Sequence, residues 1–296
     1  MVYFPEFWYR GETTAGGYRF NFALDKIDDT WKYAPASLVG AYKARLRNNK
    51  LYSESGVESA VNISMAEFST RARSRGAGYH IIDYQQHCII AWMFYARYLT
   101  RDSQGVCGAG KSAYSGLKCG STNTLGITDT TTSNATSSSN LHVNFLGIEG
   151  CWGYKYEWIE GIHSYVGDAV IAYDKGDYHD QTYVNTSSST KRRVFTGPNE
   201  SGCIREIAAG EYMDMCGKIF GDSSSTYFCD YCGCYTSSSH VFRRSHYSNS
   251  AYGGVACLIG AGSSSYTAAN IGSRLAFDGT ITVASSVSAF KSLSLL

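Results

Sequence analysis

The stretch that decides the fold runs from Val143 to Gly167 and reads VNFLGIEGCWGYKYEWIEGIHSYVG. It is apolar and aromatic, with glycines at turn positions, which is typical of short buried strands joined by tight turns. Its carboxylates, Glu149, Glu157 and Glu160, allow two interpretations. They could pair for acid–base chemistry, or they could bond to backbone and arginine around a core tryptophan, which this composition favours.

Upstream of this stretch the pattern becomes helical. Residues Tyr84 to Leu99 carry apolar side chains at three-to-four spacing, and Asp83 can cap the helix that they predict. A second helix is expected from Ser64 to Arg75, because Ser64 and Glu67 have the spacing of a capping box.

Strands and loops fill the rest of the chain. Alternating aromatic and polar residues predict N-terminal strands within residues 1–30, and a Gly-, Ser- and Thr-rich insert covers residues 102–140. Short segments divided by Ser and Gly clusters follow to the end. We expect a single α+β domain over residues 1–296, with few helices, many short antiparallel strands and long loops.

Composition narrows the class of protein. The chain has 296 residues and a net charge of +1, and this near-neutral charge does not indicate a nucleic-acid partner. No apolar run is long enough to span a membrane, and we expect no membrane insertion. The first residues, MVYFPEFWYRGE, lack the pattern of a signal peptide, so we expect a protein made in the cytoplasm whose ten cysteines are not a secreted disulfide framework.

The C-terminal quarter has a restricted alphabet. From Ile219 to Phe290 there is no Lys, Glu, Gln, Met, Trp or Pro, and Ser, Tyr, Gly, Cys, Asn, His, Thr and Arg stand in their place. Tyrosine gives large contact area at low entropy cost, and Ser, Gly and Asn give adaptable hydrogen bonds, so this is the chemistry of a recognition surface. Codons that end in a pyrimidine would produce the same absences, except that of Pro.

Several motifs suggest other chemistry, and we expect no cofactor, metal or catalytic residue from them. Residues Gly105 to Ser112 match the nucleotide-binding P-loop, but the strand before it and the helix after it are not predicted. Alternatively, Cys229, Cys232 and Cys234 could bind zinc or form a redox pair. A zinc site could also include His240 and His246 as ligands. Loops with Asp129, Asp174 and Asp222 could bind calcium.

Three segments together resemble one family, the formylglycine-generating-enzyme-like domains. Residues 75–100 resemble the turn, strand and aromatic helix of that family. Residues 144–161 resemble its Asp/Glu-x-x-Gly-Asn-x-x-Glu-Trp segment, with Gly153, Glu157 and Trp158 in matching places, and residues 271–277 (IGSRLAF) resemble its last strand. The resemblance covers about residues 31–280 and implies a C-type-lectin-like fold.

The enzymatic members carry a catalytic cysteine pair in a segment that does not align with this chain. The chain is more similar to a non-enzymatic branch, the variable proteins of diversity-generating retroelements, which includes receptor-binding tail proteins of tailed phages. That resemblance implies a phage tail-fibre or virion protein that displays a hypervariable surface to a bacterial receptor, protein or glycan, with homotrimers as one expected assembly. The alternative is a Cys-dependent, sulfatase-modifying enzyme on the same fold.

The resemblance also implies which residues bind and which support. The diversified binding segment is expected within residues 228–273, and its contacting residues are Cys232, Cys234, Tyr235, His240, Phe242, Arg244, His246, Tyr247, Tyr252 and Cys257. The scaffold is expected to depend on Trp152, Gly153, Glu157, Trp158, Gly254, Gly272 and Arg274, with Arg274 bonded to backbone carbonyls.

Overall fold

A computed structural model gives the architecture of most of the chain. The residues that it describes are 1–165, 169–173, 191–196, 199–210, 212–221, 223, 225–226, 228–235, 237–238, 240–246, 252–284, 286 and 288.

Strands dominate the described structure, with 33% of residues in strands and 14% in helices. Ordinary domains have more helix than strand, so the expected sheet-rich α+β class with few helices is confirmed. In chain order the elements are β1 (Val2–Phe4), β2 (Phe7–Thr14), β3 (Gly17–Ala23), β4 (Lys32–Ala34), β5 (Ser37–Val39), β6 (Ala44–Arg47), β7 (Lys50–Ser53), α1 (Met65–Arg73), β8 (Tyr79–Ile81), α2 (Tyr84–Tyr98), α3 (Ser103–Cys107), η1 (Asn123–Leu125), β9 (Asn144–Phe145), β10 (Ile148–Glu149), β11 (Tyr156–Tyr165), β12 (Ala169–Tyr173), β13 (Lys191–Thr196), β14 (Glu200–Ile207), β15 (Gly217–Gly221), β16 (Tyr231–Cys234), β17 (His240–Arg244), β18 (Leu258–Gly260), β19 (Ile271–Gly272) and β20 (Leu275–Phe277).

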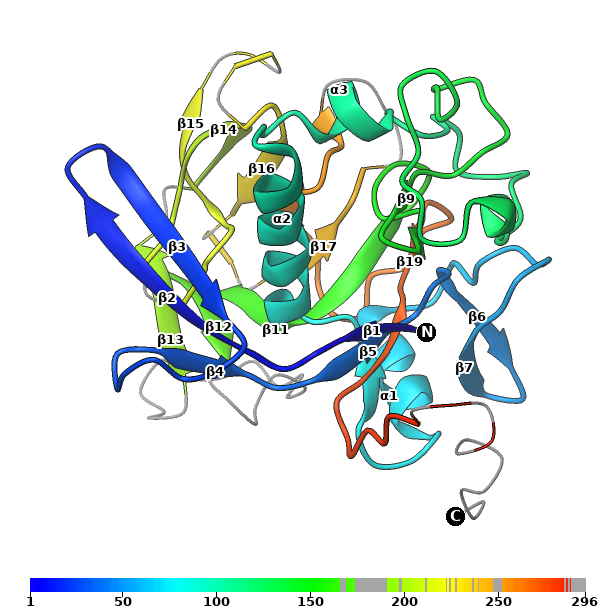
Figure 1. The fold of residues 1–296 in the computed structure, drawn as a ribbon. Coiled ribbons are helices and arrows are strands. Elements are labelled where there is room, and N and C mark those ends of the chain that lie inside the picture. Colours follow the sequence, from blue (N-terminus) through cyan, green and yellow to red (C-terminus); the bar gives the residue numbers. More distant parts are fainter. Residues whose placement is uncertain are drawn as a thin grey trace.

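One large sheet organises the molecule, in the order β13-β12-β11-β17-β18-β16-β14-β15, with β19 beside β11. Its neighbouring strands are mostly antiparallel, but the pairs β16–β18 and β11–β19 are parallel. The C-terminal strands β16, β17 and β18 therefore lie at the centre of the sheet, behind α2 (Figure 1).

Both faces of this sheet are covered, and strand alternation decides which residue serves which face. On one face, Ile90 and Phe94 of α2 share a hydrophobic core with Phe242 and Leu258. On the other, Phe68 of α1 belongs to a second core with Trp158, Val241 and Ile259. Each of β11, β17 and β18 contributes to both cores, which fixes its register.

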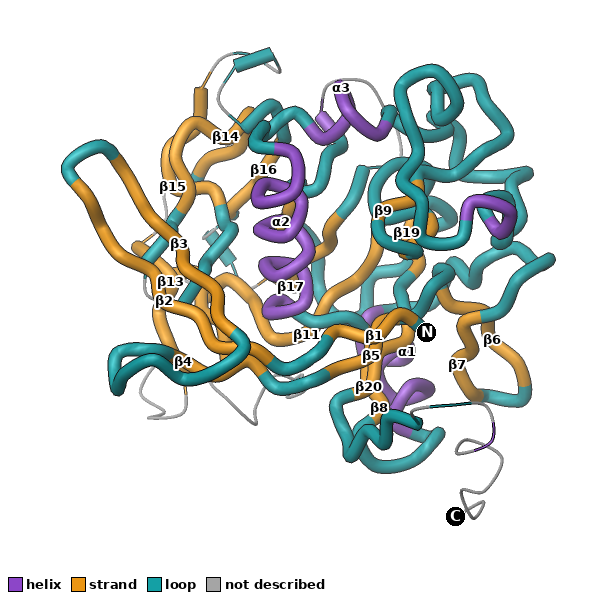
Figure 2. The backbone as a smooth tube through the Cα atoms, in the orientation of Figure 1, coloured by secondary structure: helices purple, strands orange, loops and turns teal. Residues whose placement is uncertain are grey.

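Segments from the two ends of the chain meet in a second sheet, ordered β1-β5-β20-β8. Strand β20 pairs with both β5 and β8, so this C-terminal strand lies between two strands of the N-terminal third. Figure 2 shows these four short strands side by side, below α2.

Both predicted helices are present, and each begins at its predicted cap. In α1 the Ser64 side chain accepts from the Glu67 N–H, and the Glu67 side chain returns to the Ser64 N–H. In α2 Asp83 and Gln86 make the same reciprocal pair. Such a box satisfies two backbone donors that the first turn leaves open, which is why local sequence predicted both starts.

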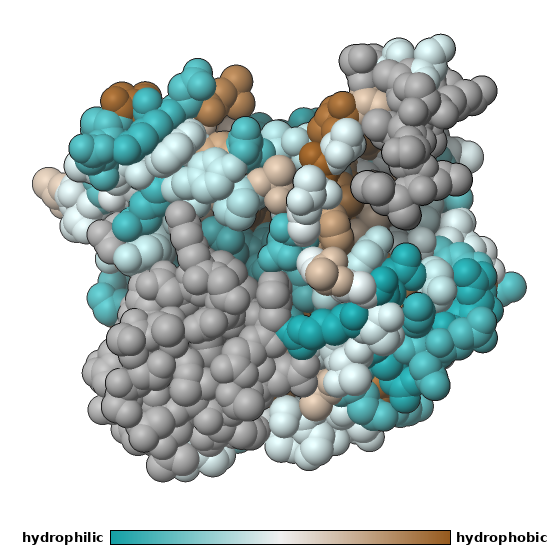
Figure 3. Space-filling view, turned by 90° about the horizontal axis from the view of Figure 1, so that it is seen from below, coloured by the Kyte–Doolittle hydropathy of each residue, from teal (hydrophilic) through white to brown (hydrophobic). Residues whose placement is uncertain are grey.

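Outside these layers, β2 and β3 form the expected N-terminal hairpin, which projects from the body (Figure 1). The insert expected over residues 102–140 begins with the short helix α3, and from residue 108 to 140 η1 is its only regular element. No helix in the described part of the chain has the length and hydropathy needed to span a bilayer. Seen from below, the coloured surface is mostly hydrophilic or intermediate, with hydrophobic residues in small groups (Figure 3).

Candidate ligand-binding face

Along strand β16, Tyr231–Cys234, residues that point into the core lie next to residues that point outward. Cys232 and Cys234 are fully buried, whereas Tyr231 and Tyr235, on either side, are half-buried. Strand geometry imposes this pattern, because successive side chains point to opposite faces of a sheet. Cys232 lies opposite Leu258 and Cys234 opposite Gly260, so the inward row continues onto β18.

Five of the residues expected on the contacting surface are in the interior, so that part of the prediction is wrong. Strand alternation turns four of them toward the core that contains α2, and the fifth donates its thiol to the Ser245 carbonyl from the turn before β18. The five buried residues are Cys232, Cys234, Phe242, Arg244 and Cys257.

Tyr235, His240, His246 and Tyr252, also expected to contact the ligand, keep partial or full exposure. Tyr247 lies outside the described residues.

The exposed side chains form aromatic pairs across the outer face. Tyr231 meets Tyr252 edge to face, with ring centroids 5.8 Å apart, and Tyr235 meets His240 at 6.3 Å. His246 packs edge to face on Tyr156 at 5.2 Å. Paired rings hold each other in place, so contacts within the chain order the side chains of this face.

Arg243 supplies the positive charge of this face. Its guanidinium carbon lies 4.5 Å from the ring centroid of Tyr156, and Nη1 donates to the Ala261 carbonyl at 3.2 Å. Arg243 alternates with the buried Phe242 and Arg244 along β17. It was missing from the sequence-based set, as were Tyr231 and the exposed Tyr266. The alternation of Tyr with Cys along residues 231–235 was the signal that could have found Tyr231.

The two histidines of this face are neutral at physiological pH. His240 accepts the Gly262 N–H at Nδ1 and bonds to the Ser238 hydroxyl through Nε2. Burial lowers the pKa of His240, and burial together with the charge of Arg243 lowers the pKa of His246 to about 4. Both rings therefore offer uncharged aromatic surface and hydrogen bonds.

Behind this face lies a buried ionic cluster centred on Glu157. Its carboxylate accepts from Lys43 Nζ at 3.0 Å, Arg244 Nη1 at 2.8 Å and Arg274 Nε at 3.0 Å, and all four side chains are buried. Burial opposes ionisation of Glu157, but the charges of Arg274, Lys43 and Arg244 hold its pKa well below the ordinary value. Burial lowers the pKa of Lys43 to about 8, against the attraction of Glu157.

The cluster links distant parts of the chain. Arg244 Nε donates to His87 Nδ1 at 3.1 Å, which joins β17 to α2. Arg274 donates to the carbonyls of Gly40, Glu149 and Gly150, so the backbone hydrogen bonds expected of it are present. Removing Glu157 would leave three buried cations without their shared carboxylate.

All seven residues expected to support the scaffold lie in the interior. They are Trp152, Gly153, Glu157, Trp158, Gly254, Gly272 and Arg274. At Gly254 a Cβ would stand 1.9 Å from an Asp230 carboxylate oxygen, so no side chain fits there. Gly153 has a φ of +73°, which other residues rarely adopt, and a Cβ there would meet the Ala109 carbonyl at 2.5 Å.

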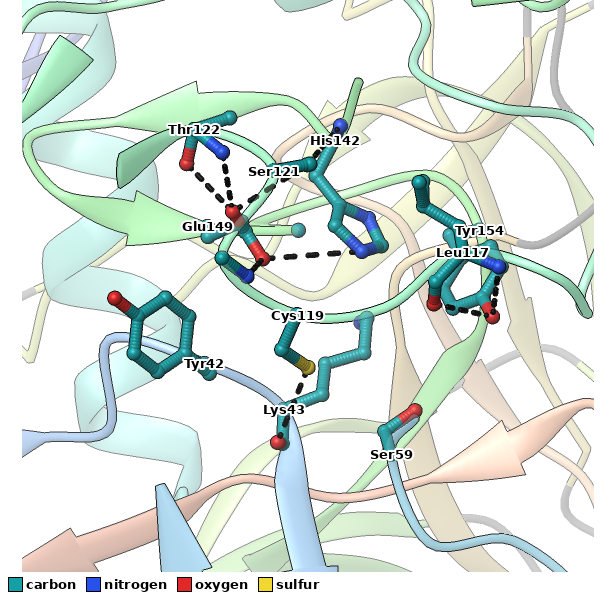
Figure 4. Close-up of polar contacts among 12 residues, drawn as sticks. Tyr42, Lys43, Ser59, Leu117, Cys119, Ser121, Thr122, His142, Glu149 and Tyr154 are labelled. Atoms are coloured by element: carbon teal, nitrogen blue, oxygen red, sulfur yellow. Dashed lines mark hydrogen bonds and ion pairs between the residues drawn. The ribbon is translucent and has the colours of Figure 1, made fainter. Parts of the chain in front are cut away.

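A second buried polar cluster surrounds Glu149 (Figure 4). Its carboxylate accepts from the Gly120 N–H at 2.7 Å and from the Thr122 N–H and hydroxyl at 2.8 and 2.7 Å. The His142 Nε2 lies 3.8 Å away. Burial and the charge of Lys43 lower the pKa of His142 to about 3, so this histidine is neutral.

None of the three glutamates is arranged for acid–base chemistry, because each is bound to structural partners. Glu149 holds a backbone turn, Glu157 is ion-paired with three buried cations, and Glu160 accepts from Ser69 and from Arg73. The interpretation that they bond to backbone and arginine around core tryptophans is confirmed.

The cysteines show no activated thiol at the surface. Every cysteine but Cys229 is buried. Burial, followed by the charge of Asp102, raises the pKa of Cys229 to about 11. Burial likewise raises the pKa of Cys119, beside Lys43, to about 11. A nucleophilic thiol needs the opposite shift.

The P-loop match and the candidate calcium ligand Asp129 both have structural roles. The P-loop match begins inside α3, with Asp102 as its N-cap, and an irregular loop follows it instead of a helix. It borders an open pocket of about 430 Å³ that also includes Cys229 and Asp230. Asp129 accepts from the Leu146 N–H and pairs with Arg97, while Asp174 and Asp222 lie outside the described residues.

The zinc set suggested by sequence is not brought together. His240 and His246 are half-buried, with His240 bonded to Ser238 and Gly262 and His246 packed on Tyr156, whereas Cys232 and Cys234 are fully buried. No family model matches the chain, and no curated protein is similar to it.

Proposed function

We propose that this protein binds a ligand or receptor through the outer face of β16 and β17 and the loops beside them. The observation that carries the proposal is the division of residues along these strands. Tyrosine, histidine and arginine occupy the half-buried positions Tyr231, Tyr235, His240 and Arg243, and the intervening residues are fixed in the core. Tyr and Arg are among the residue types most enriched in binding hot spots.

The scaffold suits such a role. Two cores and a buried ionic cluster fix the inner residues of this face. Its outer side chains can therefore be exchanged without loss of the fold. We propose that the scaffold is C-type-lectin-like, as the resemblance to the formylglycine-generating-enzyme-like domains implies.

The biological setting belongs to the same proposal. The restricted alphabet from Ile219 to Phe290 fits a variable protein of a diversity-generating retroelement, and its partner would be a protein or glycan receptor on a bacterial surface. As a receptor-binding part of a phage virion, the protein would gain avidity from display in several copies, for example as a homotrimer.

The thiol-dependent enzyme of the same resemblance receives less support. Such an enzyme needs an accessible, ionisable thiol, and in the described residues the half-buried Cys229 has a raised pKa.

Binding of the labelled protein to intact cells from a panel of bacterial strains tests the proposal. Replacing Tyr235 and Tyr252 together with Ala should lower the affinity for a bound strain at least about tenfold, because each ring is a candidate hot spot. Tyr114→Ala is the matched control, since Tyr114 and Tyr252 are similarly exposed, at 43% and 45%.

The unfolding transition of each variant should stay within about 1 kcal/mol of the wild type. Equal loss of binding by Tyr114→Ala, or unchanged binding by the double variant, would refute the assignment of this face. Binding to no strain of a panel that includes the source host would refute the receptor-binding function.

A further inference from the structure

Three thiols converge in the interior behind the outer face. The Sγ of Cys216 lies 3.4 Å from that of Cys234, and the Sγ atoms of Cys232 and Cys234 are 3.7 Å apart. All three sulfur atoms lie within 4.8 Å of one another, and all three side chains are buried. Within the described residues, this is the one place where three side chains of metal-binding type come together.

The chain builds this cluster from two elements that are not adjacent in the sheet. Cys232 and Cys234 are two residues apart on β16 and therefore share its inner face. Cys216 directly precedes β15, and β14 separates β15 from β16. Gly217, the first residue of β15, nevertheless lies against Cys232, and its carbonyl accepts from Cys234 Sγ, so Cys216 meets the other two thiols directly.

One glycine leaves the space that this approach needs. A Cβ at Gly217 would stand 3.0 Å from Cys232 Cβ and 3.2 Å from its Sγ, so a side chain there would crowd the thiols.

The sulfur spacing suits a shared metal ion. A zinc–sulfur bond of about 2.3 Å places two thiolates of one tetrahedral ion about 3.8 Å apart, and those of a trigonal ion about 4.0 Å apart. The observed 3.4 and 3.7 Å are within about 0.4 Å of the tetrahedral value. Thiolate ligands select soft ions such as Cu(I) and Zn(II) over Mg(II) or Ca(II).

We propose that Cys216, Cys232 and Cys234 form a binding site for one thiophilic metal ion of the Cu(I) and Zn(II) class. Each thiol that becomes a ligand gives its proton to solvent, so loading releases up to three protons and needs no oxidant or reductant. The bound ion ties the turn before β15 to β16, the strand that carries Tyr231 and Tyr235. The site does not depend on the proposed receptor-binding function.

Metal titration of the reduced, chelator-stripped protein under anaerobic conditions tests this site. Cd(II), used as an optical probe, should bind one ion per chain and produce the ultraviolet charge-transfer band of a metal thiolate. Zn(II) and Cu(I), added separately and challenged with chelators, identify the preferred ion. At a free concentration 100 times the dissociation constant, the preferred ion should raise the melting temperature by about 5 °C.

Substitutions assign the ligands. Cys216→Ser and Cys234→Ser should each abolish the charge-transfer band, whereas Cys203→Ser should keep it. Cys203 is the matched control because it is buried on β14, beside the cluster but outside it.

Alkylation of the wild type gives a readout that does not depend on a variant folding. Metal should protect Cys216, Cys232 and Cys234 from a thiol reagent, and mass spectrometry after digestion identifies the protected residues. Absence of a stoichiometric band in the wild type, equal loss with Cys203→Ser, or a Cys216–Cys234 disulfide in protein prepared anaerobically would overturn the proposal.

Discussion

Replacing Glu157 with Gln should be among the most destabilising single changes in the molecule. The carboxylate makes contacts of 2.8 to 3.0 Å with Lys43, Arg244 and Arg274. At an effective dielectric constant of 20, each contact is worth about 5–6 kcal/mol of gross attraction. Desolvation of four buried ionic groups offsets most of this, and breaking such a cluster by removing one partner costs about 3–5 kcal/mol.

The loss should come mainly from the two arginines. The pKa of Lys43 is about 8 with Glu157 present, so without the carboxylate it falls further and Lys43 loses its proton near neutral pH. Arginine cannot respond in this way. Lys43→Met should therefore cost less in the Glu157→Gln protein than in the wild type, which a double-mutant cycle measures.

The dependence on pH has a defined sign. The pKa of Glu157 is depressed in the folded state, so its stabilisation is complete above the unfolded value of about 4.3 and declines as pH falls below it. The difference between wild type and Glu157→Gln should be largest at neutral pH and shrink in acid.

Urea denaturation followed by tryptophan fluorescence measures these differences. The control is Glu206→Gln, which removes an exposed pair with Lys218 at a similar distance of 3.0 Å and should cost less than about 1 kcal/mol. If Glu157→Gln at neutral pH is as stable as this control, the account of the buried cluster is refuted.

Three further changes test other parts of the structure. Trp158→Ala should cost about 3–5 kcal/mol in denaturant unfolding, because its ring is fully buried beside α1, and a wild-type midpoint would contradict that packing. His142→Asn should flatten the stability profile between about pH 6.5 and pH 3. Because the pKa of His142 is lowered in the folded state, the unfolded chain binds this proton first as pH falls. The wild type should therefore lose up to about 4–5 kcal/mol of stability over this range. An unchanged profile in the variant would show that His142 is not the cause. Ser64→Ala should cost about 1 kcal/mol by removing the cap of α1, measurable in the same urea series, whereas no cost would mean that the cap is dispensable.

Local rules of sequence predicted the elements that local contacts build. The capping pairs Ser64–Glu67 and Asp83–Gln86 each span three residues, so both helix starts could be inferred without any tertiary knowledge. The sheet-rich class followed in the same way from alternating patterns and glycine-rich turns.

It was harder to predict which residues of the C-terminal strands point into the core. The restricted alphabet indicated a recognition surface but gave no orientation, and only the pairing of β16 with β18 turns Cys232 and Cys234 inward. The burial of Arg244 depends on Glu157 and His87, which are 87 and 157 residues away in sequence. Sequence gives no local signal for such partners.

The central claim is that outward positions of the C-terminal segment are exchangeable while inward positions are fixed. Deep sequencing of the gene across a natural population of its source tests it most directly. Substitutions should concentrate at outward codons such as those for Tyr231, Tyr235 and Tyr252, with Arg244, Leu258 and Arg274 invariant. Variation spread evenly over outward and buried codons, or no variation in this segment beyond the rest of the gene, would contradict the account.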